Sequence, residues 1–132
     1  YANPDNKFVA GFLGSPSMNF LEAKFDEKDL KIPSLENLKI KKFPKLSKEN
    51  LKVTIGVRPQ DVLFKRSTKG KKIEFVENLG NLSIYHLRLD KNNSLLSESN
   101  NKENLPPGET IQITLNERSL YFFDQNSGLR IR

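Results

Sequence analysis

Alternation of apolar and polar residues, with a period of two, governs most of this chain and restricts the folds open to it. The clearest case is 51–57, where every second residue is apolar: Leu51, Val53, Ile55 and Val57. A period of two places these side chains on one face of a β-strand. Pro59 then ends the strand, because proline has no N–H to donate to a sheet. The chain is therefore expected to be built mainly from half-buried strands.

Further strands are predicted wherever alternation or a short apolar run lies between turn residues. They cover 18–25, 73–79, 82–89, 110–115 and 120–123, and 129–131 is expected to pair back across a turn at 124–128. Gly80-Asn81 and Pro106-Pro107-Gly108 mark turns. The segments 26–48 and 91–104 are rich in charged and polar residues and predict loose loops. Short strands at this spacing favour a small all-β barrel over an open sheet.

One segment near the start has a helical period instead. Asn3 is a favourable N-cap, Pro4 suits the first helical position, and Gly14-Ser15-Pro16 ends the segment. The apolar residues lie on one stripe: Phe8, Val9, Phe12 and Leu13. A helix of about three turns does not persist alone in water, so its phenylalanines require a partner surface.

The charge of the chain is concentrated in one block. The net charge is +6 over 132 residues, but 39–72 alone holds twelve lysines and arginines against Glu49 and Asp61, and the rest of the chain is net negative. Such a block suits nucleic acid or anionic lipid, although lysines also solvate loops and strand edges. Nucleic-acid binding would need stacking aromatics, and the block holds only Phe43 and Phe64. Solvation is the favoured interpretation.

Catalytic and metal-binding motifs are not visible in the sequence. There is no cysteine, and the single histidine, His86, lies inside a predicted strand with no orienting acid suggested around it, so a packed or half-exposed histidine is expected rather than a catalytic base. Lys69-Gly70-Lys71-Lys72 lacks the glycine spacing of a phosphate loop. No apolar run approaches the roughly 18 to 20 residues of a membrane span, and the first residues lack the features of a signal peptide. We therefore predict no catalytic, cofactor-binding or metal-binding residue.

Four motifs in order carry a family resemblance. Residues 3–20, NPDNKFVAGFLGSPSMNF, closely resemble a segment of the ATPase subunits of sugar-importing ABC transporters of the maltose and glycerol-phosphate types. IGVRPQDV at 55–62 is similar to that family's turn motif, VENLG at 76–80 to a strand end, and LYFFD with GLRI at 120–131 to its closing strands. Gln60 stands where the family usually has glutamate, and Tyr121 where it commonly has histidine.

The resemblance implies a fold and a role. It implies an OB-like TOBE barrel with extra strands at 18–132, preceded by a linker helix at 1–17 from the end of an ATPase domain upstream. It implies a regulatory domain that dimerises with its copy in a second ATPase subunit, without chemistry of its own. ATP and magnesium would belong to the parent ATPase domain. Partners would be the chain's own ATPase domain, the membrane subunits and a regulatory protein, at the cytoplasmic side of the membrane, and the isolated domain would be soluble.

The predicted site residues fall into two groups. The run 120–123 has no polar position, so either both of its faces are covered or one aromatic lies in an interface, and the lean core favours the interface. The predicted dimer or domain interface comprises Phe8, Phe12, Gly108, Tyr121 and Phe123. The family-motif turns comprise Gly56, Arg58, Pro59 and Gly80. Two alternatives stay open: a barrel that binds molybdate or tungstate near its glycines, and a nucleic-acid-binding OB barrel.

Overall fold

The computed structural model describes residues 5–6, 18–26, 28–36, 38–46, 51–100 and 104–132, and these residues form strands, turns and short 3-10 helices. The chain divides into two compact units, each with its own antiparallel sheet. The first unit is Tyr1–Val57 with Glu117–Arg132, and the second is Arg58–Asn116. The predicted all-β class, consistent with an OB-like TOBE fold, is confirmed.

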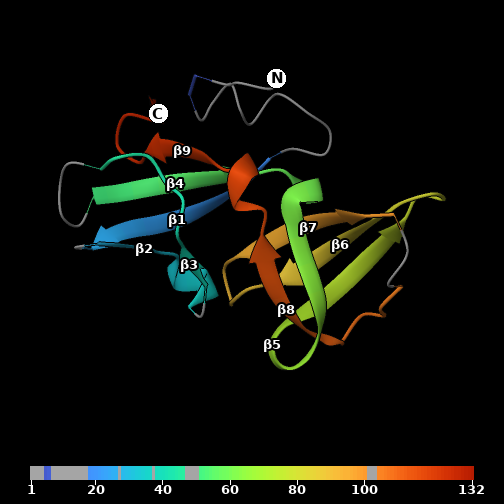
Figure 1. The fold of residues 1–132 in the computed structure, drawn as a ribbon. Helices are drawn as coiled ribbons and strands as arrows, with labels where there is room; N and C mark the ends of the chain where they lie inside the picture. The colour runs from blue at the N-terminus through green and yellow to red at the C-terminus, as the bar shows by residue number, and fades with distance from the viewer. Residues whose placement is uncertain (1–4, 7–17, 27, 37, 47–50, 101–103) are drawn as a thin grey trace. The chain divides into compact units, whose positions relative to one another are not determined.

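The sheet of the first unit has six strands. They are β1 (Asn19–Asp26), β2 (Asp29–Lys31), β3 (Lys39–Ile40), β4 (Leu51–Val57), β9 (Tyr121–Asp124) and β10 (Arg130–Ile131). Their order is β10-β9-β4-β1-β2-β3, and Figure 1 shows β9, β4 and β1 lying side by side. The 3-10 helix η1 (Pro33–Leu35) connects β2 to β3, and η3 (Glu117–Ser119) precedes β9. The strands predicted at 18–25, 51–57, 120–123 and 129–131 are all present.

The core of this unit includes residues from a segment that the sequence predicts to be a loose loop. Leu21 of β1, Ile55 of β4 and Phe122 of β9 lie in register and are buried. Four residues of 28–40 are also buried: Leu30, Ile32, Leu35 and Ile40. The prediction of a loose loop is therefore wrong for 28–36 and 38–40. Strands of two and three residues are too short to show alternation, and only their pairing, β2 with β1 and β3 with β2, identifies them.

The sheet of the second unit has four strands in the order β7-β6-β5-β8. They are β5 (Val62–Asn78), β6 (Ser83–Arg88), β7 (Ser94–Ser99) and β8 (Thr110–Leu115), and the 3-10 helix η2 (Pro59–Asp61) precedes β5. The hairpin of β5 and β6 through Gly80-Asn81 and the strand at 110–115 confirm two predictions. The prediction of a loose loop at 91–104 is wrong for β7, in which Leu95 and Ser97 are buried.

The long strand β5 is interrupted by an excursion from its ladder with β8. Arg66 and Lys71 both pair with Ile111, so 67–70 leave the ladder. Gly70 has φ +144°, and a Cβ there would lie 2.1 Å from the carbonyl oxygen of Ile111. Only glycine permits both this conformation and this close approach of two backbones.

The predicted N-terminal helix lies outside the described residues, apart from Asp5 and Asn6. Asn6 forms an antiparallel bridge with Leu129, and the carbonyl of Asp5 accepts the N–H of Arg130 at 3.0 Å. The Asp5 carboxylate also pairs with Arg132 at 2.7 Å, and this hydrogen bond lowers the pKa of Asp5. These two residues therefore continue the β-structure of β10. Among the described residues, none belongs to a helix that could cross a lipid bilayer.

Candidate functional site

The residues of the predicted family-motif turns occupy backbone positions with special requirements. Gly56 of β4 faces the side chains of Met18 and Phe123, and a Cβ there would lie 2.6 Å from the Met18 sulfur and 3.1 Å from the Phe123 ring. A side chain at this position would have to displace both. Glycine at 56 is thus explained by packing within the first unit.

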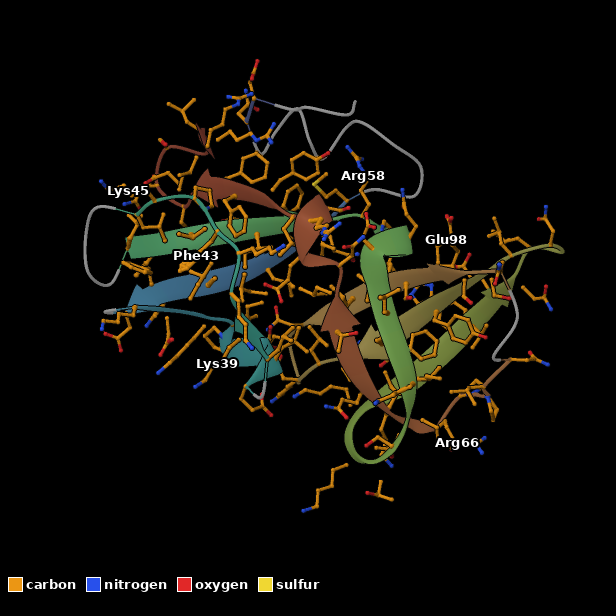
Figure 2. All side chains as sticks on the ribbon, viewed as in Figure 1. Lys39, Phe43, Lys45, Arg58, Arg66 and Glu98 are labelled. Atoms are coloured by element: carbon orange, nitrogen blue, oxygen red, sulfur yellow. The ribbon has the colours of Figure 1, made fainter. Side chains whose placement is uncertain are left out.

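The next part of the same motif forms η2 in the second unit. The N–H of Asp61 donates to the carbonyl of Arg58 at 2.9 Å, and Pro59 opens the 3-10 helix. Arg58, which is drawn in Figure 2, is only 6% exposed. Arginine is seldom buried unless it is paired, so this side chain belongs to the interior and is not a freely available surface cation. Gln60, the departure from the family pattern, is exposed.

Gly80 and Gly108 both serve turns of the second unit. Gly80 has φ +97° and donates its N–H to the Asn78 side chain at 3.1 Å. Gly108 has φ +90° and donates to the carbonyl of Ile73 at 2.8 Å. Both glycines are exposed and have open space where a Cβ would lie. Their positive φ angles, rather than steric crowding, explain the choice of residue.

The predicted interface residues are not equally accessible. Phe123 is 0% exposed and, with Met18, forms a cluster against which Phe20 and Tyr121 pack. The adjacent Phe122 is also buried, so the expectation that one face of 120–123 is left uncovered within the chain is wrong for both phenylalanines. Tyr121 is half-buried, and the guanidinium of Arg130 lies 4.8 Å from its ring centre. That Tyr121 and Gly108 contribute to an interface stays a prediction. Phe8 and Phe12 lie outside the described residues.

His86 has the acidic neighbour that the sequence did not reveal. Its Nε2 lies 2.6 Å from a carboxylate oxygen of Glu77, and its ring stacks on Phe75 with centres 4.1 Å apart. Register explains the contact: His86 lies opposite Phe75, and Glu77 is two residues further along the same face of β5. The expectation that no acid lies near His86 is wrong, although the pair is part of an exposed sheet surface in which Phe75 is 46% exposed.

A second ion pair continues this face of the sheet. Arg88 donates to both carboxylate oxygens of Glu74, at 2.8 and 2.9 Å. This hydrogen bonding lowers the pKa of Glu74 and raises the pKa of Arg88. Beside it, the side chain of Asn93 and the backbone of Asn92 hydrogen-bond Asp90 and lower its pKa. The surface of the β5–β6 hairpin is therefore a mixture of paired charges around a stacked aromatic pair.

The basic block is divided between the two units. Lys39 and Lys45 flank Phe43 in the first unit, and Arg66 lies on β5 in the second, as Figure 2 shows. Arg66 pairs with Glu109 at 2.8 Å. The two aromatics of the block are engaged in packing: Phe43 against Phe25, with ring centres 5.7 Å apart, and Phe64 against Tyr85 at 4.8 Å. The block therefore lacks a surface of free aromatics for stacking nucleic-acid bases.

No group of three or more histidine, aspartate or glutamate side chains that could hold a metal ion occurs within the described residues. The carboxylates described above form hydrogen bonds or ion pairs with arginine, histidine or backbone N–H groups.

Two family models match the chain and together cover most of it. The MalK OB fold domain matches residues 14–62, and the TOBE domain matches residues 55–123. The first match covers β1 to β4 of the first unit, and the second continues through the second unit to β9.

The chain is also similar to import proteins over its whole length. It is 28% identical to the oligosaccharides import ATP-binding protein MsmX of Bacillus subtilis, covering 100% of this chain and 39% of that protein. It is 33% identical to the sn-glycerol-3-phosphate import ATP-binding protein UgpC 2 of Agrobacterium fabrum, covering 99% and 36%. It is 31% identical to the trehalose/maltose import ATP-binding protein MalK of Thermococcus litoralis, covering 99% and 39%. The chain thus spans less than two fifths of the length of these relatives.

Proposed function

The chain belongs to the TOBE domain family, and on this premise we propose that it is the C-terminal regulatory and dimerisation domain of the ATP-binding subunit of an ABC importer for sugars or related solutes. The supporting observation is that 99–100% of the chain aligns with ATP-binding proteins of oligosaccharide, glycerol-phosphate and trehalose/maltose import. The whole protein would couple ATP hydrolysis to solute import. ATP and magnesium would bind in its ATPase domain.

The proposed role of this domain is mechanical and regulatory. Two antiparallel sheets with buried cores resist deformation, so the domain can stay paired with a second copy while the ATPase domains open and close. The paired charges and the Phe75–His86 stack on the β5–β6 surface suit the rim of a protein contact. The proposed partners are the second copy, the chain's own ATPase domain, the membrane subunits and a regulatory protein, at the cytoplasmic face of the membrane.

A chimera tests the proposal directly. The segment of Bacillus subtilis MsmX that aligns with this chain is replaced by residues 1–132, and growth on an oligosaccharide is measured in a strain without MsmX. We expect the chimera to restore growth, and MsmX truncated before the segment to fail. A chimera that is produced in normal amounts but supports no more growth than the truncated protein would contradict the proposal.

The remaining alternatives have their own measurements. The isolated chain is expected to hydrolyse no ATP, because the proposed site lies in another domain. If the isolated chain hydrolyses ATP and still does so in the variant His86→Ala, another residue of this chain must be catalytic. Titration calorimetry with molybdate is expected to show no binding heat, and saturable binding would favour the oxyanion-binding barrel.

A further inference from the structure

Four lysines lie in one row across the sheet of the first unit, and we call them the lysine row. Lys24 of β1 lies directly opposite Lys52 of β4 on one side and Lys31 of β2 on the other, and Lys31 in turn lies opposite Lys39 of β3. Directly opposed residues point to the same face of a sheet, and all four side chains are exposed. Figure 1 shows β4, β1 and β2, three of the strands that the row crosses.

Protection of a sheet edge does not explain the row. Lysine on an edge strand discourages pairing with a further strand. Of the four strands that carry the row, only β3 ends the sheet, so this function accounts for Lys39 alone. Like charges directly opposite each other destabilise a sheet, whereas opposite charges stabilise it. A surface built only for solubility is served equally well by alternating signs, so the repulsion within the row calls for another explanation.

The charges of the row are not neutralised within the chain. None of the four lysines forms an ion pair with another residue in the described ranges. Three arginines behave differently, since Arg66, Arg88 and Arg132 each contact a carboxylate. An anionic partner from outside the chain would therefore relieve the repulsion between the lysines.

The row is only one residue wide, because exposed acids lie beside it on the same face. They are Glu22 and Asp26, two residues before and after Lys24, and Asp29, two residues before Lys31. Positions two apart in a strand are separated by about 6.6 Å. A lipid surface or a nucleic-acid duplex is wider than this spacing and would cover the acids together with the lysines. A single polypeptide segment that lies along the row avoids them.

Single-stranded nucleic acid is narrow enough but needs aromatic side chains on which its bases can stack. The two aromatics of β1 already pack against other rings, Phe20 against Phe123 and Phe25 against Phe43. The strand that carries the centre of the row therefore offers no free ring to a base. This favours a polypeptide with carboxylates over a nucleic acid.

The length of the row fits one face of a helix. Neighbouring strands lie about 4.8 Å apart, so the four lysines span about 14 Å. Carboxylates placed once per turn of an α-helix are about 5.4 Å apart along its axis, so four of them span about 16 Å. In an extended chain the side chains of one face repeat every 6.6 Å or so, and four of them span about 20 Å. The helix matches more closely, and the flexible lysine side chains can accommodate the remaining difference.

We propose that the lysine row binds the acidic face of a helix of another protein, which carries one carboxylate per turn. The helix lies along the row, across the strands, and its carboxylates pair with the lysines. The inference goes beyond the proposed function, because it states the chemistry of a partner surface and does not require that the chain serves an importer.

Fluorescence anisotropy with two labelled peptides tests the geometry. Both are alanine-based helical peptides with the same number of glutamates, which lie on one face at one per turn in the first peptide and all around the helix in the second. We expect the first peptide to bind the chain severalfold more tightly at low ionic strength, and added salt to weaken its binding. Circular dichroism checks that the two peptides are equally helical.

Variants of the row test the residues. Lys24→Gln with Lys31→Gln should weaken binding of the first peptide about fivefold, because two exposed ion pairs are lost. The matched control is Lys69→Gln with Lys91→Gln, which makes the same change of net charge at exposed positions of the second unit and should bind like the unaltered chain. The variant of the row should also have a Tm at least as high as that of the unaltered chain, because repulsion between strands is removed.

Equal binding of the two peptides, or a variant of the row that binds as tightly as the control variant, would overturn the inference. Tighter binding of single-stranded oligothymidylate than of the first peptide, lost in the same variant, would overturn it in favour of nucleic acid. Failure of the MsmX chimera would refute the importer role and leave this inference, because the peptide assay uses the chain alone.

Discussion

We expect the buried hydroxyl of Tyr85 to lower the free energy of unfolding of the protein. Tyr85 on β6 is 0% exposed, and its hydroxyl has no hydrogen-bond partner among the residues that the structure describes. A buried polar group without a partner costs about 1–3 kcal/mol. The variant Tyr85→Phe removes only the hydroxyl and keeps the ring contact with Phe64. We expect its free energy of unfolding to rise by about 1 kcal/mol, the low end of that range, because phenylalanine also loses the polar atom's contacts.

The assay is urea denaturation followed by circular dichroism, with thermal unfolding beside it. For a chain of this length, a gain of 1 kcal/mol corresponds to an increase in Tm of about 3 to 5 °C. The control Tyr85→Leu removes the ring as well and should lose about 1–3 kcal/mol through the space it leaves. A loss of stability in Tyr85→Phe would refute the reasoning, because it would mean that the hydroxyl is hydrogen-bonded, for example to a buried water.

Three further changes test other parts of the structure. Gly70→Ala should destabilise the chain by about 3 kcal/mol or more in denaturation, since a Cβ would meet the Ile111 carbonyl at a positive φ; a change within experimental error would contradict the described excursion of β5. Gly56→Ala should cost about 1–2 kcal/mol, less than Gly70→Ala, because flexible side chains rather than backbone lie beside it. Arg88 lowers the pKa of Glu74 from its ordinary value of 4.5, so the pair stabilises the folded state above that pH. The unaltered chain should therefore have a higher free energy of unfolding than Glu74→Gln above pH 4.5, and this difference should disappear as the pH falls through the lowered pKa of Glu74. A difference that persists in acid would contradict this.

The features that follow from local pattern could be predicted from the sequence. In the strand 51–57 the apolar positions alternate without interruption. The strand 110–115 also alternates, and it lies between the turn at Pro107-Gly108 and Asn116. The turn at 124–128 was predicted from its composition, and Asp124 indeed accepts the N–H groups of Asn126 and Ser127. In these segments the local preference and the final structure agree, so a single sequence contains enough information.

The features that depend on tertiary pairing could not be predicted. Leu30 and Ile40 belong to strands too short to show a period; Leu30 pairs with Phe25 of β1, and Ile40 pairs with Leu30. The contact between His86 and Glu77 is diagonal across the β5–β6 hairpin, since the residue directly opposite His86 is Phe75. Such a contact depends on the pairing of the two strands and on the direction that each side chain takes, and neither is visible in the spacing of the residues along the chain.

Sedimentation equilibrium of the chain, from micromolar to millimolar concentration, tests most directly the central claim that this domain pairs with a second copy. The account predicts a monomer–dimer equilibrium within this range, because the proposed role requires two copies of the domain to meet. A monomer over the whole range would contradict the account.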